Sequence, residues 1–221
     1  MRKLHILVEG QTEEVVVNDV IRPYLSSEDV YVTTSILTTK RPAGGPAYKG
    51  GVTSWGKISR EIQLLLGDTS TTLLTTLIDY YGFPGDAPGM ETRPRGSPYE
   101  RVEHVERAIA EAVDSGRFLP HLVLHEIEAW VLSDCQRLGD LMGDPPGATQ
   151  LAREVDSEPS PEMVNDGTDT APSKRIVRAY PQYVKTFDGP LVIADTGLDS
   201  IRQRCPHADR WVAHVEAALK S

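Results

Sequence analysis

The fold is decided close to the N-terminus, by the stretch Leu4-His5-Ile6-Leu7-Val8-Glu9-Gly10-Gln11-Thr12-Glu13-Glu14. Its first five residues form a short apolar run, which predicts a buried β-strand that stops at Glu9. A helix is expected next, because Thr12 offers an N-cap and the two following glutamates suit the positive end of a helix. Strand, turn and helix in this order indicate an α/β protein, with the carboxylate of Glu9 at the carboxyl end of the first strand.

The rest of the chain repeats this alternation. Further strands are predicted at residues 30–37, 73–78, 119–124 and 191–194, and helices at residues 12–22, 55–66, 99–115, 173–180, 198–204 and 208–219. Alternating elements predict a mostly parallel sheet flanked by helices, of the Rossmann-like kind. We expect residues 1–221 to form a single domain, with a long irregular insertion at about 143–170, where the sequence is polar and rich in Pro, Asp and Glu.

The composition is that of an ordinary folded protein, with 39% hydrophobic and 25% charged residues. Nothing in the sequence approaches the roughly 20 apolar residues of a membrane span, so no membrane partner is expected. The two cysteines, Cys135 and Cys205, are too few and too far apart for a disulfide framework. Reduced thiols in a cytoplasmic protein are the simplest interpretation.

The net charge of -9 argues against passive, non-specific binding of nucleic acid, because neutralising phosphates supplies most of that affinity. The charge is segregated, however, since residues 30–60 and 171–187 contain basic residues and no acid. Lys40 and Arg41 in the first window, and Lys174 and Arg175 in the second, are therefore candidates for phosphate binding. Two solvated basic loops explain the same pattern equally well.

Four acidic residues stand at or just past the carboxyl ends of predicted strands: Glu9, Asp79, Glu126 and Glu128. In a parallel sheet these ends meet at one edge, where ligands bind. Carboxylates with several waters are the ligands that Mg²⁺ or Mn²⁺ prefers during phosphate chemistry. We expect these four acids to be metal ligands and catalytic residues, although a single acid after a strand is more often a helix cap or part of a solvated turn. Glu13 and His125 are secondary candidates.

A zinc site is a weaker prediction. His121 and His125 stand four residues apart, and Glu126 follows, which is reminiscent of the helical H-E-x-x-H arrangement. The intervening residues predict a strand, in which positions four apart are separated by about 13 Å and cannot share one ion.

Several short motifs together resemble a bacterial family described only as a domain of unknown function, which is itself similar to TOPRIM domains. They are Leu7-Val8-Glu9-Gly10-Gln11-Thr12-Glu13-Glu14, Asp79-Tyr80-Tyr81-Gly82, His125-Glu126-Ile127-Glu128-Ala129, Ala171-Pro172-Ser173-Lys174-Arg175 and Cys205-Pro206-His207. TOPRIM domains, including those of the overcoming-lysogenization-defect nucleases, bind magnesium through a glutamate after the first strand and a D-x-D motif after a later one. The resemblance implies that Glu9 is this glutamate and Asp79 the first aspartate, while Tyr81 occupies the second aspartate position.

Two functions follow from this resemblance. The first is a magnesium-dependent, TOPRIM-like nuclease in phage defence, in which Lys174 and Arg175 steady phosphate or transition-state charge. The second is a non-catalytic subunit that binds and regulates an ATPase partner, which Tyr81 favours. Hydrolysis of a small phosphate ester by the same acids is a third alternative, and a homo-oligomer is left open.

Overall fold

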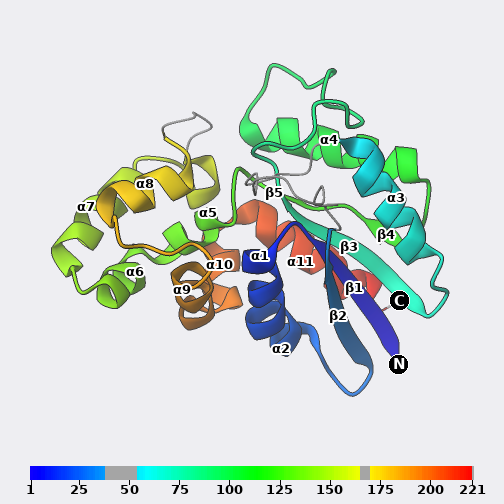
Figure 1. Cartoon of the computed structure of the whole chain (residues 1–221), viewed down its shortest axis with the longest axis horizontal. Coiled ribbons are helices and arrows are strands. Elements are labelled where there is room, and N and C mark those ends of the chain that lie inside the picture. Colours follow the sequence, from blue (N-terminus) through cyan, green and yellow to red (C-terminus); the bar gives the residue numbers. More distant parts are fainter. Residues whose placement is uncertain (38–53, 165–169, 221) are drawn as a thin grey trace, which may run out of the picture.

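The computed structural model describes residues 1–37, 54–164 and 170–220. Its strands form one parallel sheet in the order β2-β1-β3-β4, with β5 paired to the end of β3 (Figure 1). The strands are β1 (Arg2–Val8), β2 (Val30–Ile36), β3 (Thr71–Asp79), β4 (Phe118–Leu119) and β5 (Leu122–Val123). The predicted parallel sheet flanked by helices is therefore confirmed, whereas its TOPRIM-like identity stays a prediction.

Helices cover both faces of the sheet. On one face, Leu7 of β1 and Leu74 of β3 pack against α3 (Trp55–Leu66) and α4 (Pro98–Val113). On the other face, Leu4 and Leu77 belong to one hydrophobic core with the remaining helices, some of which extend beyond the sheet to one side (Figure 1). The remaining helices are α1 (Gln11–Val16), α2 (Arg22–Leu25), α5 (Glu128–Val131), α6 (Cys135–Met142), α7 (Pro145–Val155), α8 (Pro172–Ala179), α9 (Asp188–Thr196), α10 (Leu198–Arg204) and α11 (Pro206–Ala218). Within the described residues, no helix is long and apolar enough to cross a membrane.

The first helix differs from its prediction at both ends. It begins after Gly10, which makes no side-chain cap, and Thr12 is buried rather than capping. It also continues past Pro23, because a π-helical turn at Val17–Ile21 joins α1 to α2. Proline lacks the N–H of a regular helix and crowds the preceding turn, and a widened π turn accommodates both effects.

Two of the predicted strands are wrong or incomplete. Residues 191–194 belong to α9, because a four-residue apolar run has no period that separates a buried strand from a buried helix. The strand predicted at 119–124 is split into β4 and β5. Pro120 stands between them, and proline cannot donate to the hydrogen-bond ladder of a sheet.

The insertion predicted to be irregular contains α7 and a short 3-10 helix, η3 (Pro161–Met163). The polar residues that suggested a loop are helix-start residues instead: the side chain of Asp144 caps α7, and Pro145 opens its first turn. Behind them, Ala148, Leu151 and Val155 form a buried helical face. Residues 165–169 lie outside the described part of the chain.

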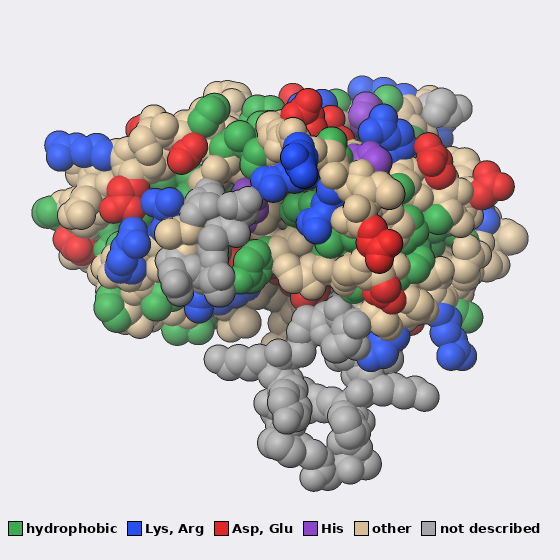
Figure 2. All heavy atoms as spheres, turned by 90° about the horizontal axis from the view of Figure 1, so that it is seen from above, with side chains coloured by type: hydrophobic (Ala, Val, Ile, Leu, Met, Phe, Trp, Pro, Cys, Tyr) green, Lys and Arg blue, Asp and Glu red, His purple; other side chains and the backbone are tan. Residues whose placement is uncertain are grey.

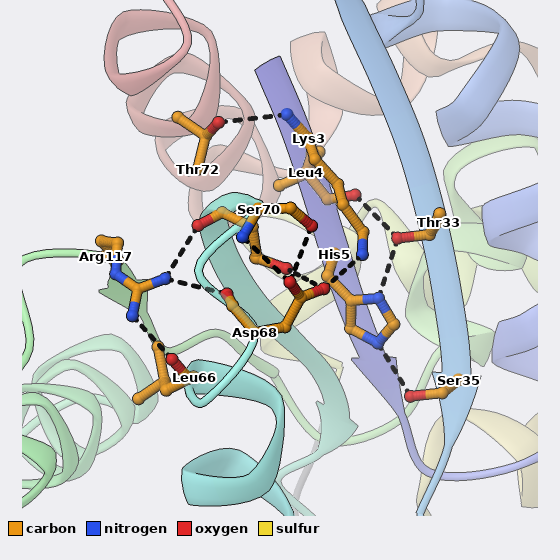
Figure 3. Close-up of polar contacts among 11 residues, drawn as sticks. Lys3, Leu4, His5, Thr33, Ser35, Leu66, Asp68, Ser70, Thr72 and Arg117 are labelled. Atoms are coloured by element: carbon orange, nitrogen blue, oxygen red, sulfur yellow. Dashed lines mark hydrogen bonds and ion pairs between the residues drawn. The ribbon is translucent and has the colours of Figure 1, made fainter. Parts of the chain in front are cut away.

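Polar contacts hold the amino ends of the strands together (Figure 3). Lys3 pairs with Asp68 at 2.7 Å, and Arg117 donates to the backbone oxygens of Leu66, Asp68 and Thr71. The ring of His5 contacts Thr33 and Ser35 of β2, each at 2.8 Å. The contacts of Lys3 and Arg117 thus lie at the amino ends of the strands, and His5 joins β1 to β2 further along them.

Candidate functional site

The carboxyl ends of β1 and β3 form a topological switch point. The chain leaves β1 toward β2 on one side and later returns to β3 on the other, so the crossovers diverge between β1 and β3. Parallel α/β sheets bind ligands at this position. Glu9 directly follows β1, and Asp79 is the last residue of β3. The two are in contact, because the backbone N–H of Asp79 donates to Glu9 Oε2 at 3.3 Å.

A left-handed turn brings Glu126 and Glu128 to the same place. His125 has a φ of 66°, a conformation that few non-glycine residues adopt. The chain reverses there, and the N–H of Ile127 donates to Asp79 Oδ1 at 3.0 Å. Glu128 then opens α5 fully buried, while Glu126 Oε2 accepts a hydrogen bond from the N–H of Ser173 at 2.9 Å.

Lys185 lies among these acids, although the sequence did not single it out. Its Nζ is 2.9 Å from Glu128 Oε2 and 3.6 Å from Asp79 Oδ2. The other oxygen of Glu128, Oε1, has no hydrogen-bond partner within the described residues. We call Glu9, Glu13, Asp79, Glu126, Glu128 and Lys185 the switch-point cluster. The cluster has five carboxyl groups and one ammonium, which contacts two of them, so negative charge is left for a further cation.

The pKa values reflect this excess of acid. Burial, and next the negative charge of Glu13, raise the pKa of Glu9 to about 7. Burial likewise raises the pKa of Glu128 to about 7, against the opposing charge of Lys185. Burial raises the pKa of Asp79 well above its ordinary value. A cation at the cluster would favour the ionised form of each group.

The predicted basic residues are distributed differently. Lys174 is exposed at the start of α8, next to the residue that Glu126 contacts. Arg175 pairs with Glu154 at 3.2 Å and donates a hydrogen bond to the backbone oxygen of Thr170. Its guanidinium is therefore engaged in contacts within the protein. Lys40 and Arg41 lie outside the described residues. Figure 2, seen from the side toward which the strands run, shows Lys and Arg side chains near the middle of that face.

A second candidate metal site lies beside the edge strand β4. Among the described residues, one group of three His, Cys, Asp or Glu side chains has its possible metal-ligand atoms within 4.8 Å of one another, and it consists of Glu106, His121 and His207. This buried group, which we call the edge triad, could hold a metal ion. The carboxylates of the switch-point cluster are spaced more widely, so a hard cation there would keep water molecules between itself and some of them.

Two members of the edge triad have the protonation states that metal binding requires, whereas the pKa of the third, His207, is raised: burial opposes its charged form, but the hydrogen bond and charge of Glu106 outweigh burial. Burial opposes ionisation of Glu106, but hydrogen bonds from both histidines outweigh it and lower the pKa to about 2. Burial lowers the pKa of His121 to about 4. Glu106 is therefore an anion and His121 a neutral imidazole near pH 7.

The pairing of histidines suggested by the sequence is not the one that the structure brings together. His121 joins Glu106 and His207, which come from distant parts of the chain. His125 instead lines a separate cavity of about 290 Å³ together with Tyr81. Positions four apart on a strand share a face but are separated by about 13 Å, and the left-handed turn at His125 ends the extended chain before that residue.

Comparison with protein-family models shows which family the chain belongs to. A family model described as a domain of unknown function (DUF4276) matches residues 8–216. The chain belongs to this family. The DUF4276 match includes every member of the switch-point cluster and of the edge triad. No curated protein and no solved structure matches the chain, and the family match carries no link to TOPRIM domains, so that part of the resemblance stays a prediction.

Proposed function

We propose that this DUF4276 protein is a Mg²⁺- or Mn²⁺-dependent phosphodiesterase that cleaves nucleic acid, built on a TOPRIM-like scaffold. The observation that carries the proposal is the convergence of Glu9, Asp79, Glu126 and Glu128 at the β1/β3 switch point. Acids from distant parts of the sequence meet there at the position where α/β sheets bind ligands. Their burial is costly unless a cation compensates for it.

The cluster supplies the groups that this chemistry needs. Glu9 and Asp79 would hold the metal ion, with Glu126 and Glu128 acting directly or through water. A bound divalent cation polarises a phosphodiester and lowers the pKa of an attacking water. Lys185 is placed to stabilise negative charge on the phosphate, because its ammonium stands among the carboxylates. Lys174, exposed at the start of α8, would contact the nucleic-acid backbone nearby.

Tyr81 stands where the TOPRIM pattern has its second aspartate, so another acid would have to take that role. The side chain of Tyr81 is 41% exposed and lies on a cavity wall beside His125, outside the cluster. Lys185 Nζ contacts both Asp79 and Glu128, so these two carboxylates lie close together. We propose that Glu128 takes the place of the second aspartate.

The decisive experiment measures plasmid nicking and RNA cleavage with Mg²⁺ or Mn²⁺. Glu9→Gln should lower the rate by about 100-fold or more, because it removes a metal-binding charge. Glu111→Gln, a change at an exposed residue of α4, should keep wild-type activity. Equal rates for wild type and Glu9→Gln would reject the assignment. Activity on mononucleotides but not on polymers would indicate a small phosphate ester as substrate.

A non-catalytic subunit that regulates an ATPase partner is the second candidate. Lys185 favours it, because its ammonium already neutralises part of the charge at Asp79 and Glu128. Calorimetry separates the two functions. The nuclease should bind Mn²⁺ as wild type and lose it as Asp79→Asn, whereas a subunit of this kind should bind no ion in either form. A role in phage defence, a cytoplasmic location and a homo-oligomer stay predictions.

A further inference from the structure

The edge triad joins three elements at one edge of the sheet. Glu106 lies on α4, His121 between β4 and β5, and His207 at the start of α11. Glu106 Oε1 is 3.4 Å from His121 Nδ1 and 3.0 Å from His207 Nε2. Donor atoms at about 2.0–2.2 Å from a tetrahedral ion lie about 3.3–3.6 Å from one another. The two distances from Glu106 are therefore close to those of a tetrahedral site, and all three ligand atoms lie within 4.8 Å of one another.

Contacts outside the triad hold two of its members in place. The N–H and the carbonyl of His121 both bond to the hydroxyl of Thr76 at 2.8 Å. Glu162 accepts the backbone N–H groups of His207 at 2.8 Å and Ala208 at 3.0 Å, which anchors the start of α11. Rings of His121 and Trp211 stack with centroids 4.5 Å apart. A site whose donors are fixed before the ion arrives binds it more tightly.

Glu106 Oε1 faces more hydrogen-bond donors than its lone pairs can accept. Glu106 Oε1 accepts the N–H of Leu122 at 2.7 Å and also faces both imidazoles. A carboxylate oxygen has two lone pairs for these three groups. The outer nitrogens, His121 Nε2 and His207 Nδ1, are buried without a hydrogen-bond partner in the described residues. A cation between the inner nitrogens and Glu106 would relieve this crowding.

An open cavity adjoins the triad. It has a volume of about 360 Å³ and is lined by the triad itself together with Arg107, Arg210 and His214. The space is large enough for water or a small anion to occupy a fourth coordination position. Sites with three protein ligands and one open position are typical of zinc ions that act on a bound ligand.

We propose that Glu106, His121 and His207 bind one divalent transition-metal ion, Zn²⁺ in the first place, with the fourth position open to this cavity. Two imidazoles select such an ion over Mg²⁺, which prefers oxygen ligands. The edge triad shares no residue with the switch-point cluster. The proposal therefore stands or fails separately from the proposed nuclease activity.

Calorimetry of the chelator-treated full chain tests the site, with Zn²⁺ added in excess Mg²⁺. Wild type should bind one equivalent, and His207→Ala and Glu106→Gln should weaken binding by about 100-fold or more. His214→Ala is the matched control, since this exposed histidine lines the cavity outside the triad. Absence of Zn²⁺ binding in wild type, or equal binding in all four proteins, would overturn the proposal.

A measurement on wild type alone covers the case in which the variants fail to fold. Co²⁺ in place of Zn²⁺ should give visible absorption bands of a tetrahedral nitrogen and oxygen site, and azide should shift them by entering the open position. Absence of these bands, or of the shift, contradicts the proposed coordination. A thiolate charge-transfer band would place the ion on a cysteine such as Cys205 and contradict it as well.

Discussion

At the scale of single residues, the switch-point cluster shows how one cation organises several acids. Burial alone would lower the pKa of Lys185, but Asp79 and Glu128 outweigh it and raise the pKa instead. The sequence predicted the acids, because each follows a strand, whereas Lys185 appeared only as one of the basic residues of the window 171–187 and not as a site residue. This lysine stands in an irregular segment between α8 and α9, where no periodicity tells which way a side chain points.

The raised pKa of Glu128 predicts how stability depends on pH in the metal-free protein. The carboxyl group ionises near its ordinary pKa of 4.5 when unfolded and near about 7 when folded. Between these values the folded state holds the extra proton, so raising the pH favours unfolding. Glu128→Gln cannot ionise and should gain stability relative to wild type by about 1 kcal/mol per pH unit in this window.

Urea unfolding in the presence of a chelator measures this difference at several pH values between 4.5 and about 7. Glu111→Gln, at an exposed position, should differ from wild type by an amount that does not change with pH. A constant difference for Glu128→Gln as well would show that the group ionises at its ordinary pKa in the folded protein.

At the scale of elements, the sequence predicted the long helices with an apolar period and the apolar runs that end in an acidic residue. α3 and α4 are such helices, β1 and β3 are such runs, and all four were found close to the predicted bounds. By contrast, α7 begins with Asp144 and two prolines, residue types that also favour loops, and the sequence therefore predicts an irregular segment there. The run in α9 consists of four consecutive apolar residues, of which Val192 and Ile193 are buried and Leu191 is exposed, so its sequence has no helical period.

The cap of α7 gives a test at this scale. Asp144 Oδ1 accepts the N–H of Gly147 at 3.2 Å, and a carboxylate at a helix start also interacts favourably with the helix dipole. Asp144→Ala should lower the free energy of unfolding by about 1 kcal/mol, whereas Asp144→Asn, which keeps an acceptor oxygen, should lower it less. Thermal or urea unfolding of the two variants decides; an equal loss in both would mean that the side chain does not cap the helix.

At the scale of the whole molecule, the edge triad connects the two helical layers. α4 packs on one face of the sheet and α11 on the other, and they meet beyond the short strand β4. The sequence could predict the layers, because alternation fixes which side chains of a strand share a face. It could not predict the triad, since Glu106 and His207 are 101 residues apart and no local pattern relates them.

A metal ion bound by these layers should stabilise the molecule as a whole. Zn²⁺ at about 100 times its dissociation constant should raise the free energy of unfolding by about 2.7 kcal/mol, because only the folded chain presents the three ligands together. His214→Ala should show the same increase and His207→Ala should not. Hydrogen exchange locates the effect, with slower exchange expected in α4 and α11 together. Slower exchange confined to one of these helices would mean that the ion does not join the two layers.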